Sequence, residues 1–294
     1  MSEPTTHHLT TPTGTLHYEV RGSGPLLLVI GQPMTSGPFG PLADLLATDH
    51  TVVTYDPHGL GESTVDDHGA AVTPEVEADD LARILGVLGA DSADVFGSSG
   101  GAVAGLALAT LRPDLVRTLI AHEPPVTELL PDGPYVRVAI DDAADAYRAH
   151  GSGAAWGKFV SIVMHRGPVT EAGIRPATWS PPESDGAAAP GSGEPAEPPQ
   201  PSAKQQADDE LFFLRMIQPF TRYRPEVEVL RAGRPRIVVA VGAASGAELA
   251  RRSAEALADQ LGAPPVVFPG DHGGFMADPV AFGQAIRDVL AVDR

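Results

Sequence analysis

The stretch ADVFGSSGGAVAGLALATL, residues 93–111, decides the fold of this chain. Residues 93–96 predict a strand, and the small residues at 101–111 predict a helix. Between them lies the pattern Gly-x-Ser-x-Gly, with Ser99 at its centre. A serine on a sharp bend between strand and helix leaves no room for side chains two residues to either side, so glycine is required there. The pattern predicts a nucleophilic serine, and a glycine-rich loop with incidental serines is the alternative.

Strands and helices alternate on both sides of this stretch. Short apolar or β-branched runs predict strands at residues 6–12, 15–21, 26–30, 51–55, 93–96, 116–121, 236–241 and 265–268. Helical spacing predicts helices at residues 41–47, 74–88, 101–111, 246–261 and 279–289. Regular alternation with short connections predicts an α/β fold with a mostly parallel sheet and helices on both faces.

The alternation stops near Pro124 and resumes at residue 236, so an insertion lies between the sixth and seventh predicted strands. We therefore predict a core of residues 1–125 and 226–294 and an insertion of residues 126–225. Within the insertion, helical patterns occur at 135–164 and 209–218. Residues 176–203 hold eight prolines, three glycines, four acids and no basic residue, which predicts a disordered loop.

A serine hydroxyl needs a base within hydrogen-bond reach, and histidine titrates in the suitable range. Of the ten histidines, His272 has the most favourable position. It lies in PGDHGGF, residues 269–275, after the last predicted strand and before the last helix. That loop would open at the carboxyl edge of the sheet, where Ser99 is also expected. A merely structural role for His272 stays an alternative.

Three features together resemble the α/β-hydrolase fold family over nearly the whole chain. They are the GSSGG bend, the segment DPHGLGES at residues 56–63, which is similar to the family's DxRGxGxS turn, and the late GDHGGF. The order of serine before histidine also matches, and the insertion stands where members of the family place a cap. The resemblance implies that the oxyanion hole is formed by the backbone N–H groups of Gln32 and Gly100. Ile30 departs from the family, which often has histidine there.

The acid that would orient His272 does not follow the family's usual pattern. Most relatives have an aspartate soon after the seventh strand, where this chain has Ser245. Glu248 forms Ser-x-x-Glu with Ser245, and we interpret this pair as a capping box that opens the next helix. Glu123 ends the sixth predicted strand, an edge from which some relatives, including a branch of the haloalkane dehalogenases, supply their acid. We predict Glu123 as the third catalytic residue, with a loop salt bridge as the alternative. Asp271 is less suitable as the acid because it is adjacent to His272 in the chain, and adjacent side chains usually point apart.

The composition excludes several other classes of protein. The 294 residues include no cysteine, so disulfides, thiolate metal sites and a cysteine nucleophile are absent. With 38 acidic and 20 basic residues, the formal charge of −18 would repel nucleic acids and anionic membranes, and we expect neither as a partner. The start MSEPTTHHLT lacks the features of a signal peptide, so we expect a cytoplasmic protein. No His-x-His or His-Glu-x-x-His spacing supports a metal site, no cofactor is expected, and a homo-oligomer stays open.

These residues predict a carboxylesterase-like serine hydrolase without a cofactor. His272 would deprotonate Ser99 as it attacks a small ester, lactone or thioester, and water would then resolve the acyl-enzyme. Large side chains of the insertion would line the substrate pocket, with a role in the insertion's own core as the alternative: Trp156, Phe159, Met164, Phe212, Phe213, Met216 and Phe220. Two other functions stay open, a cofactor-free lyase, cyclase or acyltransferase on the same fold, and a non-catalytic binding protein.

Overall fold

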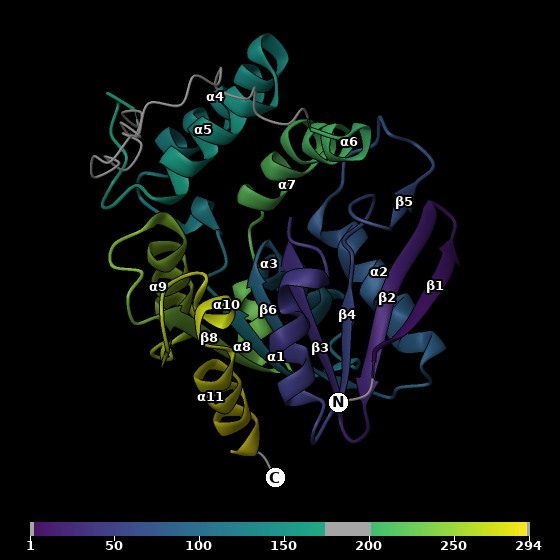
Figure 1. Ribbon diagram of the computed structural model, residues 1–294. Helices are drawn as coiled ribbons and strands as arrows, with labels where there is room; N and C mark the ends of the chain where they lie inside the picture. Colours follow the sequence, from purple (N-terminus) through teal and green to yellow (C-terminus); the bar gives the residue numbers. More distant parts are fainter. Residues whose placement is uncertain (1–2, 174–200, 293–294) are drawn as a thin grey trace, which may run out of the picture.

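The computed structural model describes residues 3–173 and 201–292, and it confirms the predicted α/β fold (Figure 1). A single mostly parallel sheet has the order β1-β2-β4-β3-β6-β7-β8-β9, and β5 pairs with β2. Strand β2 pairs antiparallel with β1, with β4 and with β5. The remaining neighbours in the sheet, in the order β4-β3-β6-β7-β8-β9, pair parallel. In chain order the strands are β1 (Thr5–Thr11), β2 (Gly14–Gly22), β3 (Leu26–Gln32), β4 (Thr51–Tyr55), β5 (Thr64–Val65), β6 (Ala93–Ser99), β7 (Val116–His122), β8 (Arg236–Gly242) and β9 (Val266–Phe268).

Helices cover both faces of this sheet because its central strands are apolar on both sides. Along β3, Leu27 and Val29 pack into one core with α1 and α11, whereas Leu28 and Ile30 pack into the other core with α2 and α3. The helices of this part of the chain are α1 (Gly40–Leu46), α2 (Pro74–Val87), α3 (Gly100–Leu111), α8 (Val227–Ala232), α9 (Leu249–Leu261), α10 (Gly274–Ala277) and α11 (Pro279–Ala291). A turn of 3-10 helix, η1 (Gly37–Phe39), precedes α1.

The chain between β7 and β8, the sixth and seventh strands of the prediction, forms further helices above the carboxyl edge of the sheet (Figure 1). After η2 (Thr127–Leu129) come α4 (Gly133–His150), α5 (Ser152–Val163), α6 (Ala203–Leu211), the π-helical turn η3 (Phe212–Met216) and α7 (Ile217–Thr221). The single helical stretch predicted at 135–164 is two helices, because the chain turns at Gly151 with φ 79°. Most of the predicted disordered loop lies outside the described residues; its last residue, Ala203, is the first residue of α6.

A partly buried ion pair joins this insertion to the core. Arg252 of α9 donates to both carboxylate oxygens of Asp132, at 2.5 and 3.1 Å, and to the carbonyl oxygen of Gly167 at 2.8 Å. The backbone N–H of Val169 also donates to Asp132, at 2.7 Å. The insertion is therefore held over one end of the sheet by charged side chains as well as by apolar packing.

Among the helices in the two described ranges, none has the length and apolar run that crossing a bilayer requires.

Candidate active site

Ser99 lies on the sharp bend where β6 passes into α3. Its backbone has φ 56° and ψ −125°, a conformation that L-residues rarely adopt. A Cβ atom on Gly97 would lie 2.6 Å from the carbonyl oxygen of Gly101, and one on Gly101 would lie 2.5 Å from that of Ile30. Both contacts are with backbone atoms, which cannot move away cheaply. The two glycines are thus required by close packing, as the sequence pattern predicts.

His272 and Glu123 form a direct contact between two loops at the carboxyl edge of the sheet. The Nδ1–H of His272 donates to Oε2 of Glu123 at 2.6 Å. The other carboxylate oxygen, Oε1, accepts the backbone N–H of Gly242 at 2.9 Å. Burial raises the pKa of Glu123, but the opposing effects, of which the hydrogen bond and charge of His272 are the largest, bring that pKa below its ordinary value. The carboxylate is therefore ionised and fixes the orientation of the imidazole.

The segment after β8 supplies no acid to His272. The predicted capping box is wrong: α9 begins at Leu249, one residue after Glu248, and Ser245 makes no side-chain cap. The reason is local, since Gly246 has φ 60° and turns the chain before the helix can start. Glu248 instead pairs with Arg166 of the insertion at 3.2 Å.

A second histidine, His122, packs behind the first. Its ring stacks on that of His272 with centroids 5.9 Å apart, and its Nδ1 lies 3.1 Å from Oγ of Ser98. Burial lowers the pKa of His122 to about 4, so this ring is neutral at neutral pH. His122 therefore contributes no positive charge beside His272.

Gln32 and Gly100, the two residues expected to form the oxyanion hole, lie next to each other and to Ser99. The last pair in the ladder of β3 and β6 is Gln32 with Ser99. A Cβ atom on Gly100 would lie 2.9 Å from both Cβ and the carbonyl oxygen of Gln32. Both residues line one cavity together with Ser99 and His272. All four residues thus border one space.

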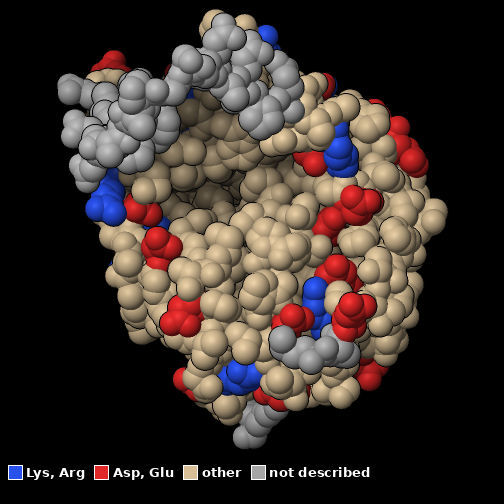
Figure 2. Space-filling view, viewed as in Figure 1, with Lys and Arg blue, Asp and Glu red and all other residues tan. Residues whose placement is uncertain are grey.

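The cavity has a volume of about 140 Å³ and lies between the sheet edge and the insertion. Figure 2 shows the surface hollowed between α5 and α7. Five of the seven side chains predicted to line a pocket border the cavity: Phe159, Met164, Phe212, Met216 and Phe220. Trp156 and Phe213 do not, since Trp156 stacks on Phe212 and donates to Asp209 at 3.0 Å, and Phe213 is fully buried. The aliphatic part of the wall was not predicted from the sequence: Ile140, Ile162, Val163, Ile217 and Leu249.

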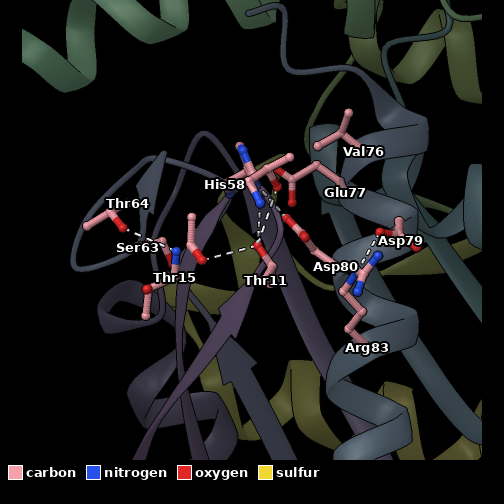
Figure 3. A network of polar contacts seen from close by, with 12 residues as sticks. Thr11, Thr15, His58, Ser63, Thr64, Val76, Glu77, Asp79, Asp80 and Arg83 are labelled. Atoms are coloured by element: carbon pink, nitrogen blue, oxygen red, sulfur yellow. Dashed lines mark hydrogen bonds and ion pairs between the residues drawn. The ribbon is translucent and has the colours of Figure 1, made fainter. Parts of the chain in front are cut away.

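The DPHGLGES turn supports the site without lining the cavity. Asp56 holds the turn by accepting the backbone N–H groups of Ser36 and Glu62, each at 2.8 Å. His58 contacts Asp80 of α2 through Nδ1 at 2.7 Å, and Figure 3 shows its ring beside Glu77 and Asp80. Within residues 3–173 and 201–292, no group of three or more histidine, aspartate or glutamate side chains is arranged so that it could hold a metal ion.

Comparisons with known proteins identify the family. The family model for the alpha/beta hydrolase fold matches residues 24–188. A curated relative from Bacillus subtilis (strain 168), the uncharacterized hydrolase YraK, is 30% identical over 292 residues, which cover 97% of this chain and 96% of the relative.

Two solved structures show the same fold at low sequence identity. An esterase from Thermogutta terrifontis has a TM-score of 0.69 and 21% identity, with 99% of each chain covered. The enol-lactonase from Burkholderia xenovorans LB400 has a TM-score of 0.65 and 15% identity, with 97% of this chain and 100% of that chain covered. The chain therefore belongs to the alpha/beta hydrolase fold family and is a hydrolase of that fold.

Proposed function

We propose that the protein is a serine hydrolase that cleaves a carboxylic ester, lactone or thioester of a small apolar substrate. Ser99 is the nucleophile, His272 the general base and acid, and Glu123 the carboxylate that orients the imidazole. The observation that carries this proposal is the 2.6 Å contact between His272 and Glu123, made by a ring that borders the same cavity as Ser99.

In this mechanism the Oγ of Ser99 attacks the carbonyl carbon while Nε2 of His272 takes its proton. The carbonyl π electrons move to the oxygen, which receives hydrogen bonds from the backbone N–H groups of Gln32 and Gly100. Collapse of this intermediate expels the alcohol or thiol, protonated by His272. Water then attacks the acyl-enzyme with His272 as base, which releases the acid and restores Ser99.

Helices α4 to α7 act as a cap that selects the substrate by size and polarity. The cavity wall is mostly aliphatic and aromatic, which favours an uncharged acyl group. A cavity of about 140 Å³ compares with the roughly 150 Å³ that accommodates benzene in an engineered protein core. We therefore expect acyl chains of about four to six carbons to be preferred over acetyl and over long fatty acyl groups.

The test combines a covalent probe with a series of aryl esters. A fluorophosphonate should label the wild type once, at Ser99, and p-nitrophenyl esters from acetate to decanoate should give the highest kcat/KM at intermediate length. Ser99→Ala should abolish labelling and lower hydrolysis more than about 10³-fold. The neighbouring Ser98→Ala, which removes a hydroxyl that contacts His122, is the matched control and should still be labelled. A wild type that does not react with the probe, or an active Ser99→Ala, contradicts the proposal.

A further inference from the structure

Glu77 is a fully buried carboxyl group that the proposed reaction does not use. It lies near the start of α2, and its hydrogen-bond partners are neutral donors rather than lysine or arginine. Burying a carboxyl group in this way costs free energy, which an apolar side chain at the same position would avoid.

Three donors converge on the two oxygens of Glu77. Its Oε1 accepts Nε2–H of Gln32 at 2.7 Å and the backbone N–H of His58 at 3.0 Å, and its Oε2 accepts the hydroxyl of Tyr55. Figure 3 shows His58 and Glu77 on facing elements, the turn after β4 and helix α2. Gln32 ends β3 and Tyr55 ends β4, so Glu77 ties α2 to the carboxyl ends of two neighbouring parallel strands.

The link to Gln32 stands apart from the other two because Gln32 borders the cavity. The amide oxygen of Gln32 is buried and has no hydrogen-bond partner in the part of the chain that the structure describes. The orientation of the amide therefore depends on the bond from Nε2 to Glu77. On its other side, Gln32 packs tightly against Gly100, so a movement of its side chain is passed to its own backbone.

We propose that Glu77 is a positioning residue for the oxyanion hole: by holding the side chain of Gln32, it fixes the backbone N–H of Gln32 where the oxyanion forms. This inference rests on the proposed serine hydrolase function. Glu77 touches neither substrate nor reacting atoms. Its effect is large only in the transition state, because an oxyanion donor must already be in place when the charge develops, and a displacement of about 1 Å can cost roughly 10²-fold in rate.

A double-mutant cycle tests the link. Gln32→Met removes the side-chain amide but keeps the backbone N–H, and Glu77→Leu removes the acceptor. Each should lower kcat roughly 10- to 100-fold with KM changed less than threefold, because an interaction made only in the transition state is lost. The double variant should be no slower than the slower single variant, since both break one bond. Glu77→Gln keeps an acceptor oxygen and should recover most of the kcat that Glu77→Leu loses.

Asp80→Asn is the matched control for damage to α2. Asp80 is also buried, lies one turn further along the helix and bonds to His58 but not to Gln32. The Asp80→Asn variant should have a lower thermal stability than wild type, while its kcat stays within twofold of the wild-type value. If Glu77→Leu does not fold, Gln32→Met still decides, because an unchanged kcat overturns the inference.

Failure of this inference can be told from failure of the proposed function. Only the role of Glu77 is overturned if the wild type reacts with the fluorophosphonate but the double variant loses kcat by the product of the two single-variant factors. A wild type that does not react with the probe overturns the proposed function and the role of Glu77 together.

Discussion

Ser99 and Glu123 are the two residues other than glycine that have a positive φ within residues 3–173 and 201–292, at 56° and 46°. Each such residue costs of order 1–3 kcal/mol and persists only when its surroundings fix it. For Glu123 the fixing contacts are its own N–H, which donates to the carbonyl oxygen of Ala240 at 2.9 Å, and its carboxylate, which accepts the N–H of Gly242. Strained backbone of this kind concentrates at functional sites, and here it occurs at two members of the proposed triad.

The carboxylate of Glu123 can be tested by an isosteric change. Glu123→Gln keeps the shape but replaces the charge that stabilises the imidazolium of His272, so kcat should fall about 10³- to 10⁴-fold while KM changes little. Steady-state kinetics with a short aryl ester measures the effect. The control is Asp271→Asn, since Oδ1 of Asp271 accepts the N–H of Gly273 rather than a bond from the imidazole. If Glu123→Gln retains more than a tenth of the activity, another acid serves His272.

At this scale, the sequence contains what is needed to predict residues that belong to a local pattern. Ser99 and His272 follow from short motifs, Gly100 from the resemblance to the family, and Glu123 from its place at the end of a strand together with that resemblance. Their catalytic roles stay predictions until they are tested. The bond between Gln32 and Glu77 could not be predicted, because it joins residues 45 positions apart through side-chain directions that no motif specifies.

Among the elements, the close approach of α3 to β3 shapes the bend at Ser99. In Gly101→Ala, the new Cβ would lie 2.5 Å from the carbonyl oxygen of Ile30 and 2.7 Å from Cα of Gly31, so helix and strand must separate. We expect the free energy of unfolding to fall by about 1–3 kcal/mol and kcat to fall with it.

Urea denaturation and ester hydrolysis measure both effects of Gly101→Ala. Gly86→Ala is the control, because a Cβ atom at this position of α2 meets nothing within 4 Å. That variant should be more stable than wild type by about 0.5–1 kcal/mol. Equal stability of Gly101→Ala and wild type would mean that the packing of α3 against β3 is not what requires glycine.

The elements were predicted best where the pattern is strongest. The strand at Thr51–Tyr55 matches its β-branched run residue for residue, and α2, at Pro74–Val87, ends one residue before the predicted 74–88. Helix α8 and the one-turn α10 were missed, since segments this short carry little periodicity. The π-helical turn η3 was also missed, because its apolar spacing is read as an ordinary helix.

For the molecule as a whole, Glu77 makes stability depend on pH. Burial first, and then the charge of Asp80, raise its pKa from 4.5 to about 7, against smaller lowering effects of Tyr55 and His58. The folded protein therefore holds this proton more tightly than the unfolded chain. Its contribution to stability is full below pH 4.5, falls as the pH rises to about 7, and stays reduced above that.

Glu77→Gln removes this dependence because glutamine does not titrate. Relative to wild type, its free energy of unfolding should rise by about 3 kcal/mol between pH 4.5 and pH 8. Denaturant titrations at both pH values measure the difference. Glu75→Gln, which removes an exposed carboxylate from the same helix, controls for the loss of one charge. A difference between Glu77→Gln and wild type that is the same at both pH values would show that Glu77 does not bind its proton more tightly in the folded state.

The fold of the whole chain was predictable because alternating strands and helices leave few arrangements other than a parallel sheet covered on both faces. The position of the insertion on the sheet was not predictable, since the ion pair of Arg252 with Asp132 joins residues 120 positions apart. The residues of the cavity wall could not be predicted in full either. An amphipathic helix shows which side chains are apolar, but not whether they face a cavity or another helix.

The carboxylate that contacts His272, that of Glu123, follows β7, so the chain after β8 does not hold the histidine. Its last residues reach the cavity: Glu248 and Leu249 form part of the wall. Substitutions in that segment can therefore alter which compounds fit while leaving the histidine's partner in place. The residues of this segment that border the cavity and the carboxylate that contacts His272 therefore lie on different loops, so one can change without the other.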